Sequence, residues 1–424
     1  MTVVFLSDDG VWVSGVGSWI KRKRLELLAP GGTLEKLKWA AVYGADAVYF
    51  GAPFGSLRNF AGNLSREEMA EGLAFLHRLG KRGYLALNIY PFSEEYDKIL
   101  DVAQQFDEMG GDAVIVSDLG VLHQMRKLAL NAALHVSTQA NTTSWQAALA
   151  YKDLGARRVN LARELSLARI RHIREMTQGK IETEVFAHGA VCFSMSGRCA
   201  ISDYLTGFGS NHGECKHPCR WRYALVEESR PGEYMPVFED DRGCYLFNSK
   251  DLALVEFVPA LEHAGVDALK IEGRMKSVHY VASVVWLYRQ ILDGKRFSPK
   301  TLRRLLDRVS NRGYSSGFMK GEIVDADYDR TRSRSEGAAT FVGLTTETSA
   351  DGTCVLAVKN KLHGGETLEV LSPAHPLFTV TLPKFLTTTD DRTIGEANNP
   401  QYLRLPFQLA PYTILRRVDG EFLR

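Results

Sequence analysis

The segment GADAVYFG, residues 44–51, decides the fold class of this chain. Its first glycine ends a helix-like stretch, and an apolar, partly aromatic run follows at once, as expected where a left-handed helix C-cap leads into a buried strand. The pattern returns as GGDAVIV (110–116), GARRVNL (155–161) and GVDALKI (265–271). Such a repeated unit predicts β-strands that alternate with amphipathic helices.

Eight strands of this kind are predicted between residues 25 and 294, most of them followed by a helix. Eight βα units of this size predict an α/β fold, a closed parallel (βα)8 barrel of the TIM type. An open doubly wound sheet is the alternative, but APGGTLEKL (29–37) after the first strand lacks the G-x-G-x-x-G spacing of that fold. The predicted strands are residues 25–30, 47–51, 84–88, 113–118, 134–141, 157–164, 182–189 and 268–274.

A chain of 424 residues is too long for one compact core, so two domains are expected. Short strands separated by Gly, Asp, Pro and Asn turns follow residue 336 and predict a small all-β barrel. The segment before them, 296–334, has ten Lys or Arg against five Asp or Glu, typical of a solvated linker or an RNA-contacting face. The predicted parts are an N-terminal extension (1–24), the barrel (25–295) with a cysteine-rich insertion (192–244), a basic helical linker (296–336) and the C-terminal β-barrel (337–424).

Four of the six cysteines, Cys192, Cys199, Cys215 and Cys219, lie within 28 residues in the spacing Cys-x6-Cys-x15-Cys-x3-Cys. Thiolates gathered in this way usually hold a soft metal centre. Structural zinc sites favour two close pairs of ligands, and only Cys215 and Cys219 fit that rule. Spacing alone therefore leaves an iron–sulfur cluster and zinc both open, with free buried cysteines as a third reading.

Disulfides are disfavoured because the N-terminal segment does not have the order of a secretory signal and no apolar run reaches transmembrane length. A cytoplasmic location without membrane contact is expected, and paired thiols are uncommon there. The cysteine-rich insertion follows the seventh predicted strand. Loops at the carboxyl ends of barrel strands carry the chemistry of such folds, so we expect these cysteines on the active face.

Polar residues that stand at the predicted strand ends should converge on one pocket. Arginines among them suit a carboxylate or phosphate, and buried ionisable side chains suggest an internal charge network of Arg163 with Glu164 and of Lys270 with Glu272 and Arg274. The alternative is that these residues only brace the barrel mouth. The strand-end residues are Glu26, Asn88, Asp118, Gln139, Asn141, Arg163, Glu164, Glu184, His188, Lys270, Glu272 and Arg274.

Within this set the roles divide by chemistry. Glu184, His188 and Glu272 are the catalytic candidates, for proton transfer or support of the metal centre. The substrate-binding candidates are Arg163, Arg198, Arg274, Gln139 and Asn141.

Several segments resemble a known family. EVFAHGAVCFSMSGRCAIS (184–202) is similar to the signature of the collagenase-like peptidase family U32, and HVSTQANTTSW (135–145), GECKHPCRWRY (213–223) and ALKIEGRMKS (268–277) resemble further family blocks in the family order. The resemblance covers nearly all of residues 25–424. The chain nevertheless shows no H-E-x-x-H motif of known metallohydrolases.

What this resemblance implies is an iron–sulfur enzyme of oxygen-independent hydroxylation, with a [4Fe-4S] cluster on Cys192, Cys199, Cys215 and Cys219. Some family members take the last ligand from a cysteine where this chain has Ala253, so Cys219 is favoured and Cys244 is the reserve.

The segments FVGLTTE (341–347) and LAVKNKLHGGETLEVLSP (356–373) are most similar to members that hydroxylate the wobble uridine of tRNA to 5-hydroxyuridine, with prephenate as cosubstrate. The resemblance thus implies tRNA and a small carboxylate as partners. The alternatives are a peptide hydrolase, a hydroxylase of rRNA cytidine or of a ubiquinone precursor, and a zinc-stabilised RNA-binding protein without catalytic activity.

Overall fold

The computed structural model describes every strand of the predicted barrel and most of the C-terminal domain. The described residues are 4–7, 10–13, 24–57, 62–191, 196–197, 199, 201–209, 211–216, 218, 225–226, 234–235, 238–240, 243–245, 250–321, 337–348 and 353–418.

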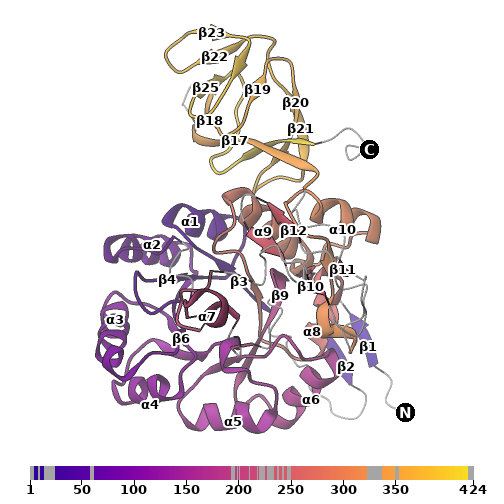
Figure 1. Ribbon diagram of the computed structural model, residues 1–424. Helices are drawn as coiled ribbons and strands as arrows, with labels where there is room; N and C mark the ends of the chain where they lie inside the picture. The colour runs from indigo at the N-terminus through magenta and orange to yellow at the C-terminus, as the bar shows by residue number, and fades with distance from the viewer. Residues whose placement is uncertain are drawn as a thin grey trace.

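Eight parallel strands form a closed barrel, as predicted (Figure 1). The strands pair in the order β15, β3, β4, β5, β6, β7, β8, β9, and β15 also pairs with β9, which closes the ring. They are β3 (Glu26–Pro30), β4 (Ala47–Gly51), β5 (Arg82–Leu87), β6 (Ala113–Val116), β7 (Ala133–Val136), β8 (Arg158–Asn160), β9 (Glu182–Gly189) and β15 (Ala268–Ile271).

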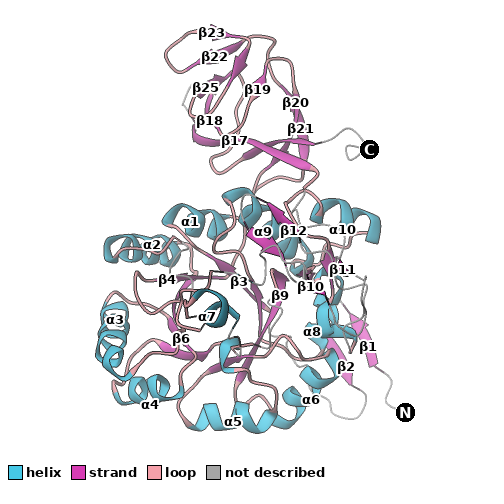
Figure 2. Ribbon diagram, viewed as in Figure 1, coloured by secondary structure: helices cyan, strands magenta, loops and turns pink. Residues whose placement is uncertain are grey.

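Helices surround the barrel and cover its outer face (Figure 2). The glycines that begin the four repeated segments all have positive φ angles, between 79° and 109°, as the C-cap interpretation requires. Ser65 begins one helix through a reciprocal capping box with Glu68. The outer helices are α1 (Leu34–Val42), α2 (Arg66–Arg78), α3 (Tyr96–Glu108), α4 (Leu119–Lys127), α5 (Trp145–Asp153), α6 (Leu167–Thr177), α8 (Val258–His263) and α9 (Val278–Leu292).

Alternate residues of each barrel strand face two different environments. On β3, Leu27 and Ala29 pack in the large core between the strands and the helices. Leu28 faces the barrel interior, where it clusters with Tyr84 and Ile115. The interior is therefore a packed core with its own polar layers, not a pore.

Further short elements flank the barrel. A hairpin of β1 (Val4–Ser7) and β2 (Gly10–Val13) lies in the N-terminal extension, and β14 (Asp251–Ala253) and β16 (Tyr314–Ser315) continue the sheet beyond β9. Within the cysteine-rich insertion lie α7 (Ile201–Thr206), the pair β10 (Leu225–Val226) and β11 (Tyr234–Met235), and the pair β12 (Phe238–Asp240) and β13 (Gly243–Tyr245). No helix in the described part of the chain has the length and apolarity to cross a bilayer.

After α10 (Pro299–Leu306) the chain enters the predicted all-β domain, an antiparallel sheet that curves into a half-barrel. Its strands pair in the order β21, β20, β26, β17, β18, β25, β22, β23, and β19 pairs with β24. They are β17 (Ala339–Thr348), β18 (Cys354–Val358), β19 (Leu362–His363), β20 (Thr367–Leu371), β21 (Phe378–Thr381), β22 (Leu386–Thr388), β23 (Thr393–Ile394), β24 (Glu396–Ala397), β25 (Tyr402–Leu405) and β26 (Ile414–Val418).

A buried set of charges joins this domain to the barrel. Glu369 of β20 accepts hydrogen bonds from Arg308, after α10, at 2.9 and 3.1 Å and from Arg416 of β26 at 2.7 Å. Arg416 also donates to Ser283 of α9 at 3.0 Å and approaches His279 Nε2 at 3.3 Å. Burial and the charge of Arg416 lower the pKa of His279 to about 3, so this imidazole is neutral and can accept that hydrogen bond.

Candidate active site

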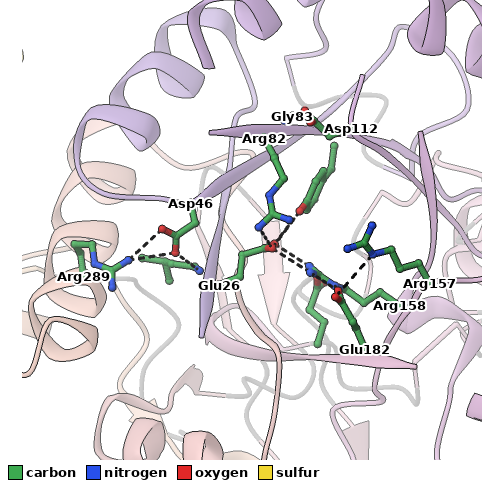
Figure 3. A network of polar contacts seen from close by, with 12 residues as sticks. Glu26, Asp46, Arg82, Gly83, Asp112, Arg157, Arg158, Glu182 and Arg289 are labelled. Atoms are coloured by element: carbon green, nitrogen blue, oxygen red, sulfur yellow. Dashed lines mark hydrogen bonds and ion pairs between the residues drawn. The ribbon is translucent and has the colours of Figure 1, made fainter. Parts of the chain in front are cut away.

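A network of ion pairs lies at the amino ends of the strands, and we call it the floor of the barrel (Figure 3). The carboxylate of Glu26 accepts hydrogen bonds from both terminal nitrogens of Arg158, at 2.8 and 3.0 Å, and from Arg82. Arg158 also donates a hydrogen bond to Glu182. Burial raises the pKa of Glu26, but the hydrogen bonds and charge of Arg158 outweigh it and lower that pKa. The expectation that Glu26 lies at a strand's carboxyl end is wrong, because β3 begins with this residue.

Glu184 lies inside the barrel and not at the carboxyl end of its strand. It is the third residue of β9 and accepts hydrogen bonds from Asn160 at 2.9 Å and Arg158 at 3.3 Å, and Lys270 Nζ lies 3.4 Å away. These contacts fill the side of the carboxylate that faces the floor. Of these three partners of Glu184, Lys270 is the one that also contacts residues of the barrel mouth.

The carboxyl ends of the strands and the loops after them form the barrel mouth, and two cations meet there. The guanidinium of Arg163 lies 4.0 Å from the centre of the Phe186 ring, and Lys270 Nζ lies 5.5 Å from the same ring and 4.3 Å from that of Tyr49. Tyr49 also donates a hydrogen bond to Glu272 at 3.1 Å. Burial lowers the pKa of Lys270, although the nearby carboxylates of Glu184 and Glu272 raise it.

Arg274 is buried and held by the loop that follows β4. Its guanidinium donates to Ser56 Oγ and to Asn63 Oδ1, both at 2.5 Å. Its backbone oxygen lies 3.3 Å from Lys36 Nζ. These contacts anchor the loop after β15 to the loop after β4, so Arg274 lies at the edge of the mouth.

His188 packs outside the barrel interior. Its ring contacts Tyr280 and Tyr288 of α9 and Tyr314 of β16 at centroid distances of 5.4 to 5.9 Å. Among the described residues neither ring nitrogen has a hydrogen-bond partner. Burial lowers the pKa of His188 to about 4, so the ring is neutral at physiological pH. The structure thus separates His188 from the Arg163 and Lys270 cations.

The described part of the cysteine-rich insertion lies across the mouth. Ser196 donates its backbone N–H to Glu164, after β8, at 2.6 Å. Gly197 has a φ of 70°, and a Cβ there would lie 1.9 Å from the backbone oxygen of Gln139, after β7. Only glycine fits both this conformation and this close approach.

A second anchor of the insertion involves the loop after β5. The backbone oxygen of Asn211 accepts from the Tyr90 N–H at 3.2 Å, and His212 Nδ1 lies 3.0 Å from the Tyr90 oxygen. Asn211 also donates to the Cys199 backbone oxygen at 3.0 Å. Figure 1 accordingly shows α7 over the centre of the strand ring. Sequence reasoning singled out Glu164 and Gln139 but not their partners in the insertion or the Tyr90 anchor.

Two of the four predicted cluster ligands are described, and both lie in this segment. Cys199 and Cys215 are both half-buried. Cys192, Cys219 and the substrate-binding candidate Arg198 lie outside the described residues, as does the side chain of Cys244. Among the residues whose placement is described, no group of three metal-binding side chains occurs.

The remaining two candidates follow β7 directly. Gln139 lies in a single 3-10 turn, and its backbone oxygen accepts a 2.5 Å hydrogen bond from the Tyr90 hydroxyl. Asn141 has a φ of 53°, a left-handed conformation that asparagine tolerates. Its Oδ1 is buried and has no partner among the described residues. Both residues therefore follow the carboxyl end of β7, and their role in substrate binding stays a prediction.

Comparison with known proteins identifies the family. The sequence model of the family "Peptidase family U32" matches residues 32–326, and that of the "Peptidase family U32 C-terminal domain" matches residues 338–416. This chain belongs to peptidase family U32. The resemblance seen in its motifs is thereby confirmed for both the barrel and the β-domain.

Relatives named for tRNA hydroxylation match this chain over most of their length. The chain is 34% identical over 411 residues to tRNA hydroxylation protein P1 of Bacillus subtilis, covering 95% of this chain and 96% of that protein. It is 36% identical over 393 residues to tRNA hydroxylation protein P of Escherichia coli, covering 82% and 86%. A 23S rRNA 5-hydroxycytidine synthase of Escherichia coli is 36% identical over 276 residues, but only 40% of that protein is covered.

Proposed function

We propose that this U32 family member is a cytoplasmic tRNA hydroxylase that converts the wobble uridine to 5-hydroxyuridine without oxygen, with prephenate as cosubstrate. The observation that carries the proposal is the match to tRNA hydroxylation protein P1 over 95% of this chain and 96% of that protein. A match of this extent includes the barrel, the cysteine-rich insertion and the β-domain together. The rRNA synthase shares a smaller part of its length.

We propose Cys192, Cys199, Cys215 and Cys219 as the ligands of a [4Fe-4S] cluster, with Cys244 as the alternative to Cys219. The fit rests on the donor set, because four thiolates are the usual ligands of such a cluster. It also rests on Cys199 and Cys215, which are half-buried in the segment held over the mouth. A cluster bound there would supply electron-transfer or Lewis-acid chemistry beside the barrel interior.

Arg163 is the proposed anchor for a carboxylate of the cosubstrate. It stacks on Phe186 at the mouth, and no carboxylate of the described residues forms an ion pair with it. Lys270 brings a second positive charge to the same aromatic ring. Two cations that share one apolar ring favour an incoming anion, and prephenate carries two carboxylates.

Replacing Arg163 by methionine is expected to raise the KM for prephenate by about 10- to 100-fold, because a hydrogen bond to a charged group contributes about 1.5–3 kcal/mol. Arg163→Lys should recover part of the loss, since it keeps the charge and loses the bidentate geometry. Steady-state kinetics with saturating tRNA measures the effect. Arg157→Met is the matched control, because Arg157 is exposed at the opposite end of the barrel. An unchanged KM in Arg163→Met would exclude this role.

The proposed function is tested with full-length protein purified without oxygen and incubated with unmodified tRNA and prephenate. Mass spectrometry of the digested nucleosides should detect 5-hydroxyuridine only when prephenate is present. Iron and acid-labile sulfide are measured on the same sample. A colourless zinc protein that binds tRNA and forms no product would instead support a non-catalytic RNA-binding role.

A further inference from the structure

Exposed large apolar side chains of the barrel gather at one end. In the described part of the barrel, two of them, Leu79 and Met176, lie at the ends of outer helices away from the mouth. The other six all follow the carboxyl ends of strands, and three belong to the insertion over the mouth. These six are Phe92, Leu119, Tyr204, Leu205, Phe208 and Met275. Such a concentration on one face marks an interaction site.

Three members of this surface are aromatic. Tyr204, on α7, is 88% exposed, and Phe208, just beyond the helix, is 42% exposed. Phe92 lies beside them, because its ring is 4.8 Å from that of His212, whose backbone N–H binds Gly209. An aromatic side chain as exposed as Tyr204 has little packing to stabilise the fold, so its ring is available to a partner.

Positive charge accompanies these rings. Lys216 Nζ lies 4.3 Å from the centre of the Phe208 ring. The surrounding segment, residues 198–222, carries four Lys or Arg against two Asp or Glu. An exposed aromatic face beside a lysine matches a nucleotide of a single strand, because its base can stack on the ring while its phosphate meets the ammonium.

We infer that Tyr204 and Phe208 form a stacking platform for unpaired bases of an RNA loop, with Lys216 contacting the adjacent phosphate. The inference rests on the proposed function and deepens it, since a uridine in a tRNA loop must be unstacked from its neighbours to enter the barrel mouth. Tyr204 lies on α7 and Phe208 just after it, and α7 lies over the centre of the strand ring (Figure 1). It would hold the flanking bases while the target base enters.

Fluorescence anisotropy with a labelled anticodon stem–loop RNA tests the platform on the full chain. The double variant Tyr204→Ala, Phe208→Ala should weaken binding by about tenfold or more, because each base–aromatic stack contributes substantially to affinity. Tyr204→Phe should bind like the wild type. Phe385→Ala is the matched control, because Phe385 is 61% exposed in the C-terminal domain. The same stem–loop with abasic loop positions should bind the wild type and the double variant equally.

An unchanged dissociation constant in the double variant would overturn the platform. So would sedimentation data in which the wild type is a dimer, the double variant is a monomer and RNA affinity is unchanged, since a second copy would then be the occupant.

The nucleoside assay separates this inference from the proposed function. Loss of loop binding in the double variant, with no 5-hydroxyuridine made by the wild type, would retain the platform and remove the hydroxylase assignment. Product formation by the wild type, with unchanged RNA binding and product formation in the double variant, would retain the hydroxylase assignment and remove the platform.

Discussion

Cys215→Ser is expected to lower 5-hydroxyuridine formation by at least about 100-fold and to remove most of the bound iron. The physical reason is that a serine hydroxyl stays protonated near neutral pH and cannot replace a thiolate ligand, while metal affinity depends on the full ligand set. Cys215 is half-buried in the segment that the Tyr90, Gln139 and Glu164 contacts hold over the mouth. Cys199→Ser should have the same effect.

Cys354→Ala supplies the control for this prediction. Cys354 is a free, fully buried cysteine of β18 in the C-terminal domain, remote in sequence from the insertion. Its substitution should leave the iron-to-protein ratio and the specific activity of the folded fraction unchanged. Iron and sulfide assays and the visible absorption spectrum measure the first quantity. If Cys215→Ser kept its full iron content and activity, Cys215 would not be a ligand.

Glu369→Ala is expected to destabilise the protein by about 3–5 kcal/mol, because it removes the carboxylate that compensates two buried guanidinium charges. Glu369, Arg308 and Arg416 are each less than 10% exposed and join the two domains. Urea unfolding followed by tryptophan fluorescence measures the change. The exposed pair Lys38–Glu71 offers the comparison, and Glu71→Gln should cost less than about 1 kcal/mol.

The same carboxylate makes stability depend on pH. Burial raises the pKa of Glu369, but the hydrogen bonds from Arg308 and the charge of Arg416 outweigh it and set the pKa below the ordinary value of 4.5. A depressed folded-state pKa stabilises the protein above pH 4.5, and this contribution is lost as the pH falls through the folded-state value. Glu369→Gln should therefore lose less stability than the wild type between pH 5 and pH 3. If the wild type and Glu369→Gln lost the same amount of stability over this range, the ionised Glu369 carboxylate would not be the source of the pH dependence.

The barrel could be predicted because its information is local. Gly44 and the three equivalent glycines each combine a helix C-cap with the start of a strand, and both signals lie within a few residues. The β-domain was predictable from turn residues in the same way. The pairing of β17 with β26 was not, because it joins segments far apart in the sequence.

The site was only partly predictable, because the direction of a side chain depends on strand register. Glu182, Glu184 and Phe186 alternate into the barrel, and the same alternation would aim His188 inward. The pairing of β9 with β15 shifts between Lys270 and Ile271, however, and His188 packs against α9 instead. A one-residue irregularity reverses the face of a strand and leaves no mark in the sequence.

The exposed aromatic surface was also invisible to sequence patterns. Tyr204 and Phe208 lie four residues apart, and this spacing alone would favour burial in a helix face. Their exposure follows from the anchoring of the insertion by Gly197 and Asn211, which are contacts to distant loops.

The central claim, a cluster-dependent tRNA hydroxylase, is tested most directly by expressing this protein in a host whose tRNA contains no 5-hydroxyuridine or its derivatives. Mass spectrometry of the host's tRNA nucleosides should then detect 5-hydroxyuridine with the wild type, and none with the equally abundant Cys215→Ser variant. Absence of the nucleoside when the wild-type protein is folded and iron-loaded, and prephenate is present in the cell, would contradict the account.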